Sequence, residues 1–335
     1  MLLTSFDPHG GTLAARPLVW PDARTMFGGA FELGVERRVK YAFRLALTWK
    51  VRDRLLREFA GMEFADALFR KEPRAFYPLM NHLIDRRLGA QGRLRATLAS
   101  LHGVCGAMGD AANVRRLIND GLTLGTLTDG TRIVLSLNGV SFHEGLWQVA
   151  LVAADGTRLY SIGFGLTDDR TLLMGNVQGP SLKDDGLDRI RDATHAAHGM
   201  RPPHLLVHAL RVLAAAWGAT RLQGVDPENH VKGKWNLRDS RLRFDYRGFW
   251  AEHEGVRDDS GNWTLPLGTA LRPLEEVPTK RRAMYRRRYA MLDALQVAVD
   301  TLADARHAVA PTPVASPELE ADAANASTLE PALVA

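Results

Sequence analysis

The feature that most constrains the fold is a series of five short apolar runs between residues 122 and 178. Asp129-Gly130, Asp155-Gly156 and Asp168-Asp169 lie between successive runs. An Asp-Gly pair between two apolar runs is a strong hairpin signal, because both residues tolerate the positive φ angles of a tight turn. The intervals are also too short for crossover helices. We therefore predict a five-stranded antiparallel meander with the runs LTLGTLT, TRIVLSLNGV, LWQVALVA, TRLYSIGFGL and TLLMGNVQG.

The residues that follow predict a helical crossover back to the same sheet. Helical patterns over 182–198 and 203–217 precede a short apolar run over 221–225. A strand, a helical connection and a further strand favour one parallel pair in an otherwise antiparallel sheet. The remaining elements that we predict are short strands over 241–246 and 263–267 and a long basic helix over 279–305.

The first third of the chain predicts helices. Apolar residues recur at helical spacing over 31–59, and further helical patterns cover 79–88 and 93–104. The predicted fold class is therefore α+β: a helical N-terminal region, a central, mostly antiparallel mixed sheet with a helix crossover, a long basic C-terminal helix and a disordered tail. The predicted units are an irregular lead-in (1–30), a helical subdomain (31–120), an α+β core domain closed by the basic helix (121–305) and a disordered acidic tail (306–335).

Composition excludes several classes of protein. The single cysteine, Cys105, rules out a disulfide framework and suits a reducing cytoplasm. The first residues lack the basic and apolar regions of a secretory signal. The longest apolar stretch, 205–219, is interrupted by His208 and Arg211 and is shorter than the ~20 residues of a spanning helix. We therefore expect a cytoplasmic protein that is at most peripheral to the inner membrane.

Two short polar segments are candidate catalytic sites. The segment GVDPENH ends a predicted strand, and it places His230 where the imidazole could act as a general base oriented by Asp226 or Glu228. Asn229 lies in the same loop. The segment SFHEG places His143 and Glu144 between two predicted strands. An ordinary Asp-Pro turn and ordinary hairpin polarity are the competing interpretations of these segments.

Aromatic residues and histidines also gather in the last third of the chain. The segment FDYRGFWAEHEG carries Tyr246 and Trp250, which could line a pocket for a chain or ring or could anchor the segment on the core. His204 and His208 have the i, i+4 spacing of some metal ligands, but the neighbouring Arg211 disfavours a cation. We expect no bound metal.

Four motifs, in this order and spacing, resemble the VirK/YbjX family of bacterial proteins. They read HGMRPPHLLVHAL (198–210), LQGVDPENHV (222–231), FDYRGFWAEHEG (244–255) and KRRAMYRRRYAMLDAL (280–295). The resemblance covers roughly residues 35–300. It implies a cytoplasmic protein that affects the Gram-negative cell envelope, in the manner of proteins associated with antimicrobial-peptide resistance and virulence, without an agreed reaction.

The segment GNVQGPSLKDDGLDRI is similar to the strand, loop and helix of acyl-CoA N-acyltransferases. In that fold, backbone N–H groups at a helix N-terminus bind the pyrophosphate of the donor. The resemblance implies that Gln178, Gly179 and Ser181 form this loop, with acyl-CoA or acyl carrier protein as the donor. The sequence departs from the pattern at Pro180, which has no N–H to donate.

The predicted C-terminal helix concentrates positive charge. The whole chain carries +5, yet six cations lie between residues 280 and 288. This cluster could bind the phosphates of an anionic small molecule, bind lipid headgroups at the inner-membrane surface, or pair with acids of the protein itself. We do not expect nucleic acid as a partner, because no module that reads bases accompanies the cluster. The predicted anion-binding residues are Arg281, Arg282, Arg286, Arg287 and Arg288.

These observations leave two functions open. The first is an acyltransferase-like enzyme that acts on an envelope precursor, in which His230, aided by Glu144 or Asp226, removes a proton from the acceptor. The second is a non-enzymatic adaptor that uses the Arg-rich helix to bind a membrane surface or a protein. The enzyme hypothesis requires His230, Glu144 and the 178–181 loop to converge on one cleft.

Overall fold

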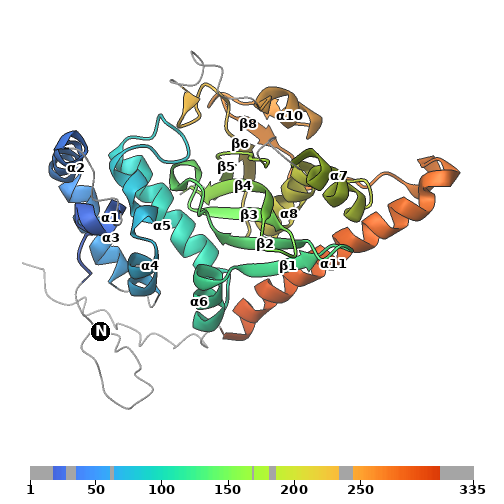
Figure 1. The fold of residues 1–335 in the computed structure, drawn as a ribbon, viewed down its shortest axis with the longest axis horizontal. Helices are drawn as coiled ribbons and strands as arrows, with labels where there is room; N and C mark the ends of the chain where they lie inside the picture. The colour runs from blue at the N-terminus through green and yellow to red at the C-terminus, as the bar shows by residue number, and fades with distance from the viewer. Residues whose placement is uncertain are drawn as a thin grey trace, which may run out of the picture.

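A computed structural model describes residues 18–27, 35–60, 64–167, 170–180, 186–233 and 244–309. Its centre is an eight-stranded mixed sheet with the order β1-β2-β3-β4-β5-β6-β8-β7, surrounded by helices (Figure 1). The predicted α+β class is therefore confirmed. The lead-in before residue 18 and the tail after residue 309 lie outside the described residues, and the described part of the lead-in contains the short helix α1 (Ala23–Phe27).

The predicted meander is confirmed, and its Asp-Gly turns form for the expected reason. In the first turn Asp129 Oδ1 accepts from Thr131 N at 2.9 Å, and in the second Asp155 Oδ1 accepts from Thr157 N at 2.8 Å. Gly130 and Gly156 both have φ angles of 84°. The five antiparallel strands are β1 (Leu122–Thr126), β2 (Arg132–Leu137), β3 (Trp147–Val152), β4 (Arg158–Leu166) and β5 (Thr171–Met174).

The predicted crossover is also confirmed. Helices α7 (Gly186–Ala196) and α8 (Pro202–Ala216) lead to β6 (Arg221–Gly224), which lies parallel to β5. Beyond β6 the sheet continues with β8 (Trp263–Leu265), which is antiparallel to β6, and ends with β7 (Val256–Arg257).

One predicted strand is wrong where the structure describes it. Residues 241–243 lie outside the described part, but Tyr246 begins a helix, α10 (Tyr246–Glu252). The side chain of Asp245 caps this helix by accepting from Gly248 N at 3.0 Å. The aromatic residues therefore face the core with helical spacing rather than alternating as they would in a strand.

The N-terminal helices differ from the prediction in two places. The pattern over 31–59 forms two helices, α2 (Val35–Leu47) and α3 (Trp49–Phe59), separated at Thr48, whose hydroxyl bonds to the carbonyl of Arg44 at 2.6 Å. The predicted helix over 79–88 is absent, because Ile84 N and Arg86 N bond to the distant carbonyls of His143 and Asn229. The remaining elements are α4 (Ala65–Lys71), η1 (Pro73–Met80), α5 (Ala90–Gly106) and α6 (Ala111–Asn119).

Helices α5 and α8 both pack against β4. Ser100 of α5 lies beside Gly165, and Gly103 of α5 lies against the side chain of Leu166. Trp217, just after α8, packs against the ring of Phe164 at 6.0 Å between centroids. The long helix α11 (Thr279–Val309) packs against α8 and β1.

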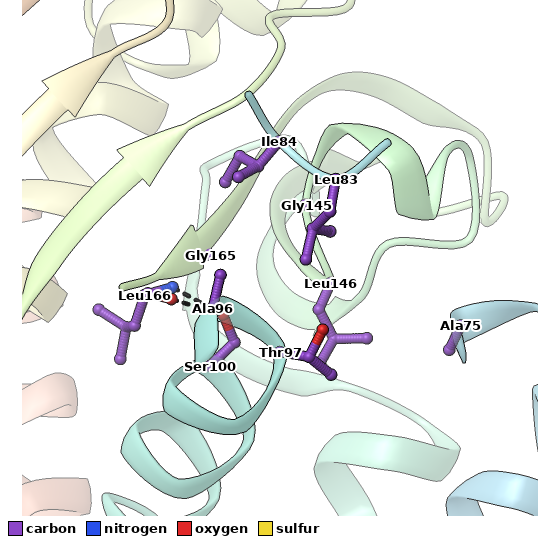
Figure 2. A pocket seen from close by; sticks show the side chains of 10 residues that line it. All are labelled: Ala75, Leu83, Ile84, Ala96, Thr97, Ser100, Gly145, Leu146, Gly165 and Leu166. Atoms are coloured by element: carbon purple, nitrogen blue, oxygen red, sulfur yellow. Dashed lines mark hydrogen bonds between the residues drawn. The ribbon is translucent and has the colours of Figure 1, made fainter. Parts of the chain in front are cut away.

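The contact between α5 and the sheet is tight. The Ser100 hydroxyl accepts from Leu166 N at 2.8 Å and donates to Leu166 O at 3.1 Å, as Figure 2 shows. The cavity beside this contact has a volume of only about 10 Å³, which admits no more than one water molecule. One hydrophobic cluster runs from Trp20 to Val299 and includes both the N-terminal helices and the sheet. The boundary predicted at residue 120 remains a prediction.

Candidate active site

The candidate site is centred on Glu144, which lies in the short 3-10 turn η2 (Phe142–Glu144) between β2 and β3. Asn138 holds this loop closed, because its Nδ2 donates to the carbonyls of Ser141 and Gly145 at 3.0 Å each. The loop folds back over the sheet, and the Glu144 side chain is only 3% exposed.

Three glycines allow this loop to lie flat on the strands. Gly145 has a φ of 132°, and a Cβ there would lie 2.6 Å from the backbone nitrogen of Phe164. A Cβ on Gly163 would lie 2.8 Å from Asn176 Oδ1, and one on Gly175 would overlap the carbonyl of Glu144. Glycines within strands often mark a close backbone approach of this kind.

Among the residues that the structure describes, three side chains lie against the Glu144 carboxylate. Asn176, just beyond β5, donates from Nδ2 to Oε2 at 2.7 Å. Lys232 Nζ lies 2.7 Å from Oε1, and His230 Nε2 lies 3.5 Å from the same oxygen. His230 is 1% exposed, but the Lys232 side chain is 52% exposed. The carboxylate therefore has two buried neighbours and one neighbour that reaches solvent.

The imidazole of His230 is held in one orientation. Its Nδ1 accepts from Lys232 N at 3.1 Å, so the neutral ring carries its proton on Nε2, facing Glu144. Burial lowers the pKa of His230 below its ordinary value, and the positive charge of Lys232 lowers it further, against the opposing effect of Glu144. The ring packs against Tyr246, with 5.6 Å between centroids. His230 is therefore neutral near pH 7.

This arrangement can accept and relay a proton. An ionised carboxylate offers only acceptor positions, and Glu144 directs one oxygen towards a half-exposed lysine. A hydroxyl or amine that replaced Lys232 Nζ would meet Oε1 at hydrogen-bond distance. The Nε2–H group of His230 would remain beside the same oxygen, 3.5 Å away and without a hydrogen bond to another described residue.

Asp226 lies in the same turn as His230 but has different partners. Its carboxylate is fully buried. It accepts hydrogen bonds from the side chains of Trp263 (Nε1, 3.0 Å) and Arg247 (Nη2, 3.1 Å) and from the backbone N–H of Glu228 (3.0 Å). Burial alone would raise the pKa of Asp226, but the hydrogen bonds, above all that from Arg247, lower it overall. The structure thus brings Glu144 rather than the Asp226 carboxylate against the ring of His230, and Asp226 fixes the turn.

Asn229 connects this turn to two other segments. Its Nδ2 donates to Asn262 Oδ1 at 3.0 Å, and its carbonyl accepts from Arg86 N at 2.9 Å. Asn262 in turn donates to the buried Asp85 at 3.2 Å. His143 directly precedes Glu144 in η2, and its Nδ1 bonds to the carbonyl of His82 at 2.7 Å. Asn229 and His143 therefore support the loops around the site.

A groove with a volume of about 320 Å³ opens between α7, α8 and α10, a size that falls within the range of small-molecule sites. Arg201 and Glu252 form an ion pair of 2.6 Å in its wall. The predicted pocket residues Tyr246 and Trp250 are buried and are not among the residues that line the groove. The aromatic residues that line the groove are Tyr160, Phe244 and Phe249.

The predicted donor loop lies at the edge of this groove. Gln178 pairs with Ser161 of β4 through two backbone hydrogen bonds of 2.8 and 2.9 Å, so its N–H is not available to a phosphate. Gly179 lies against the ring of Tyr160, where a Cβ would come within 2.8 Å of a ring carbon. Ser181 lies outside the described residues. The role of this loop stays a prediction.

The Arg-rich start of α11 divides into two groups. Arg282 donates to the carbonyls of Val277 and Glu275, and Arg288 donates to that of His198 at 2.8 Å. These two guanidinium groups therefore stabilise the fold. Three other predicted anion-binding residues are exposed: Arg281, Arg286 and Arg287.

Sequence reasoning missed Asn176 and Lys232, which complete the surroundings of Glu144. Asn176 follows Gly175 at the end of a predicted strand, and the glycines in neighbouring strands were a usable signal for a close approach. Lys232 gave no signal, because a lysine two residues after a histidine is ordinary in a loop.

Comparisons with known proteins identify relatives but no reaction. A family model described as a protein of unknown function, DUF535, matches residues 33–301. An uncharacterised protein of Haemophilus influenzae is 32% identical over 67% of this chain and 76% of its own length. No solved structure matches significantly.

Two named relatives match about half of the chain. The uncharacterised protein YbjX of Escherichia coli is 32% identical over 48% of this chain and 49% of its own length. The membrane protein LapB of Mannheimia haemolytica is 26% identical over 47% of this chain and 68% of its own length. In the described part of this chain, no helix has the length and apolar character needed to cross a bilayer. Since the family model covers most of the sequence, including the four motifs, the chain belongs to the DUF535 family of VirK/YbjX-type proteins.

Proposed function

We propose that this protein is an acyltransferase-like enzyme that acts on a precursor of the cell envelope from the cytoplasmic side. One observation carries the proposal: the buried Glu144–His230 pair lies at the carboxyl ends of the parallel strands β5 and β6. Asn176, just after β5, bonds to Glu144, and His230 follows the turn that ends β6. The crevice at the carboxyl ends of neighbouring parallel strands is a common ligand site in α/β sheets.

In this mechanism Glu144 is the proton acceptor and His230 is a positioning residue. The hydroxyl or amine of the acceptor takes the place of Lys232 Nζ at Glu144 Oε1. The acceptor atom then bonds to the acyl carbon of a thioester donor, the carbon–sulfur bond breaks, and the sulfur leaves as a thiolate. The proton of the acceptor passes to Glu144. The departing thiolate is protonated by water, and Glu144 returns its proton to solvent.

The donor would occupy the groove between α7, α8 and α10. The apolar rings of Phe244 and Phe249 suit an acyl or pantetheine chain, and Arg201 would bind a phosphate by exchanging its ion pair with Glu252. The buried Tyr246 lies between the two regions, because its ring contacts both His230 and Phe244. An envelope role is favoured by the resemblance to VirK/YbjX proteins and is consistent with the name of the relative LapB, a membrane protein.

Calorimetric titration with coenzyme A, acetyl-CoA, lauroyl-CoA and acyl carrier protein bearing a lauroyl chain tests donor binding. Hydrolysis of the bound donor, with water as the acceptor, tests the chemistry through release of free thiol. Glu144→Gln should leave binding unchanged and slow hydrolysis by about 100-fold or more, the usual contribution of a general base. Asp155→Asn, in an exposed turn, is the matched control. Failure of all four ligands to bind, or unchanged hydrolysis by Glu144→Gln, would overturn the proposal.

The adaptor hypothesis is favoured by a different observation, the exposure of Arg281, Arg286 and Arg287 on one short stretch of α11. An adaptor would bind an anionic partner through these residues and would not depend on Glu144. Replacing all three by Gln should then abolish co-purification of the partner, whereas Glu144→Gln should leave it intact. Donor turnover that survives the triple replacement favours the enzyme.

A further inference from the structure

Helix α2 exposes a continuous row of large apolar side chains. Four of them follow one another at intervals of four residues along α2, and the fifth begins α3. Residues at this spacing lie on the same side of a helix. We name this set the α2 row; its members, each 56–77% exposed, are Val35, Val39, Phe43, Leu47 and Trp49.

The α2 row is not the face that attaches α2 to the protein. That attachment uses Tyr41, which is 2% exposed and bonds to the carbonyl of Pro21 at 2.6 Å, together with Leu45 and Thr48. The helix therefore carries two apolar faces, one packed and one open. A contiguous exposed apolar surface on a folded protein commonly marks an interaction site.

The segment that carries the row is strongly basic. Residues 35–59 contain eight Lys or Arg and three Asp or Glu, a net charge of +5 that equals the charge of the whole chain. Each of the three acids pairs with a neighbouring base: Glu36 with Lys40, Asp53 with Arg57 and Glu58 with Arg54. The excess of positive charge therefore remains after these ion pairs form.

We propose that the α2 row docks onto the surface of an anionic lipid bilayer, with α2 lying in the plane of the interface. Three observations favour this occupant: large aliphatic and aromatic side chains on one face, an exposed Trp beside a lysine, and a basic surrounding segment. Helices that lie in the membrane interface combine these features. Basic residues near an anionic surface strengthen such binding, and their attraction weakens with salt.

This surface is separate from the Arg-rich start of α11. Figure 1 shows α2 at one end of the molecule and the first turns of α11 at the other end of the long axis. No residue of the α2 row is among the described neighbours of Glu144, which are Asn176, His230 and Lys232. The inference therefore goes beyond the proposed function and does not depend on any reaction.

Flotation with vesicles tests the proposal. One set contains phosphatidylcholine alone, and the other contains about one third phosphatidylglycerol. The full chain should float with the anionic vesicles, less so at high salt, and poorly with the neutral ones. Replacing Phe43 and Leu47 by Ser should lower the partition coefficient between vesicles and water at least about tenfold. The reason is that transfer of each large apolar side chain from water into the bilayer stabilises the bound state. Val297→Ser, on an exposed site of α11, is the control and should bind as the wild type does.

The alternatives give different results. Absence of binding to anionic vesicles, or equal binding by the Phe43/Leu47 variant, would overturn the proposal. If light scattering shows a wild-type dimer that the same variant converts to a monomer, without any vesicle binding, a second copy of the chain covers the row and the lipid proposal is wrong. Because both positions are exposed, the variant should retain the circular dichroism spectrum of the wild type.

Discussion

Stability should fall steeply between pH 7 and pH 5, and a measurable part of that fall should come from His253. This side chain is 7% exposed and packs against the rings of His204 and Phe249 at 4.6 and 4.8 Å. Burial, followed by the nearby charges of His204, Arg211 and Arg201, lowers its pKa to about 3 from an ordinary value of 6.5. His253 is therefore neutral in the folded protein throughout this range of pH.

The magnitude follows from proton linkage. Between pH 6.5 and pH 3 the unfolded chain binds a proton at residue 253 and the folded chain does not, so stability is present above this window and is lost as the pH falls through it. At pH 7 only a minority of unfolded chains are protonated there, and at pH 5 almost all are. The free energy of unfolding therefore decreases by about 2 kcal/mol from this group alone. This decrease of about 2 kcal/mol holds as long as the pKa of His253 in the folded protein lies well below 5.

The assay is urea denaturation at pH 5, 6 and 7 for the wild type and for His253→Leu. Leucine keeps the apolar contacts with Phe249 and removes the titrating group. Other buried histidines with lowered pKa values, such as His230, act in the same direction in both proteins, so the difference between the two curves isolates His253. The variant should lose about 2 kcal/mol less than the wild type on going from pH 7 to pH 5. Parallel curves would refute the reasoning.

Three further predictions concern the packing around the site and the core. Gly175→Ala should destabilise the protein by about 1–3 kcal/mol in urea denaturation, because its methyl group overlaps the carbonyl of Glu144, whereas Gly139→Ala meets no atom within 4 Å and serves as the control. Ser100→Ala should cost about 1–3 kcal/mol by the same measurement, because Leu166 N loses its partner. Cys105, whose pKa burial raises to about 12, should resist iodoacetamide at pH 8 until urea unfolds the chain, as followed by mass spectrometry.

The meander and the crossover could be predicted because their signals are local. A carboxylate at Asp129 or Asp155 bonds to a backbone N–H two residues later, so the turn needs nothing from the rest of the chain. The helix predicted over 79–88 is wrong for the opposite reason, because the structure of this segment depends on distant residues. Its apolar pattern suits a helix, but Ile84 N and Arg86 N bond to carbonyls 59 and 143 residues away, and these long-range bonds override the local preference.

The candidate site could be predicted only in part. The sequence indicates His230 and Glu144 separately, because each can transfer a proton and each lies in a loop at the end of a predicted strand. Their proximity follows from the pairing of those strands. The choice between Glu144 and Asp226 as the neighbour of the ring could not be made, since both are acids in loops beyond strands. Arg247 and Trp263 decide it by taking the Asp226 carboxylate, and neither is close to Asp226 in sequence.

The neighbours of Glu144 differ in how firmly they are held, and this difference favours replacement of Lys232 by an acceptor in the proposed reaction. The backbone of Glu144 packs so closely on Gly175 that a Cβ there would overlap its carbonyl, and its carboxylate accepts a hydrogen bond from Asn176. His230 is fixed by its own turn and by Tyr246. Of the described neighbours of the carboxylate, Lys232 is the one that extends to solvent, and the entropy lost by holding a long side chain weakens its interaction with Glu144. In the proposed reaction, an acceptor that carries a hydroxyl or amine would displace the lysine without disturbing the buried groups, and the carboxylate would stay in place for the incoming proton.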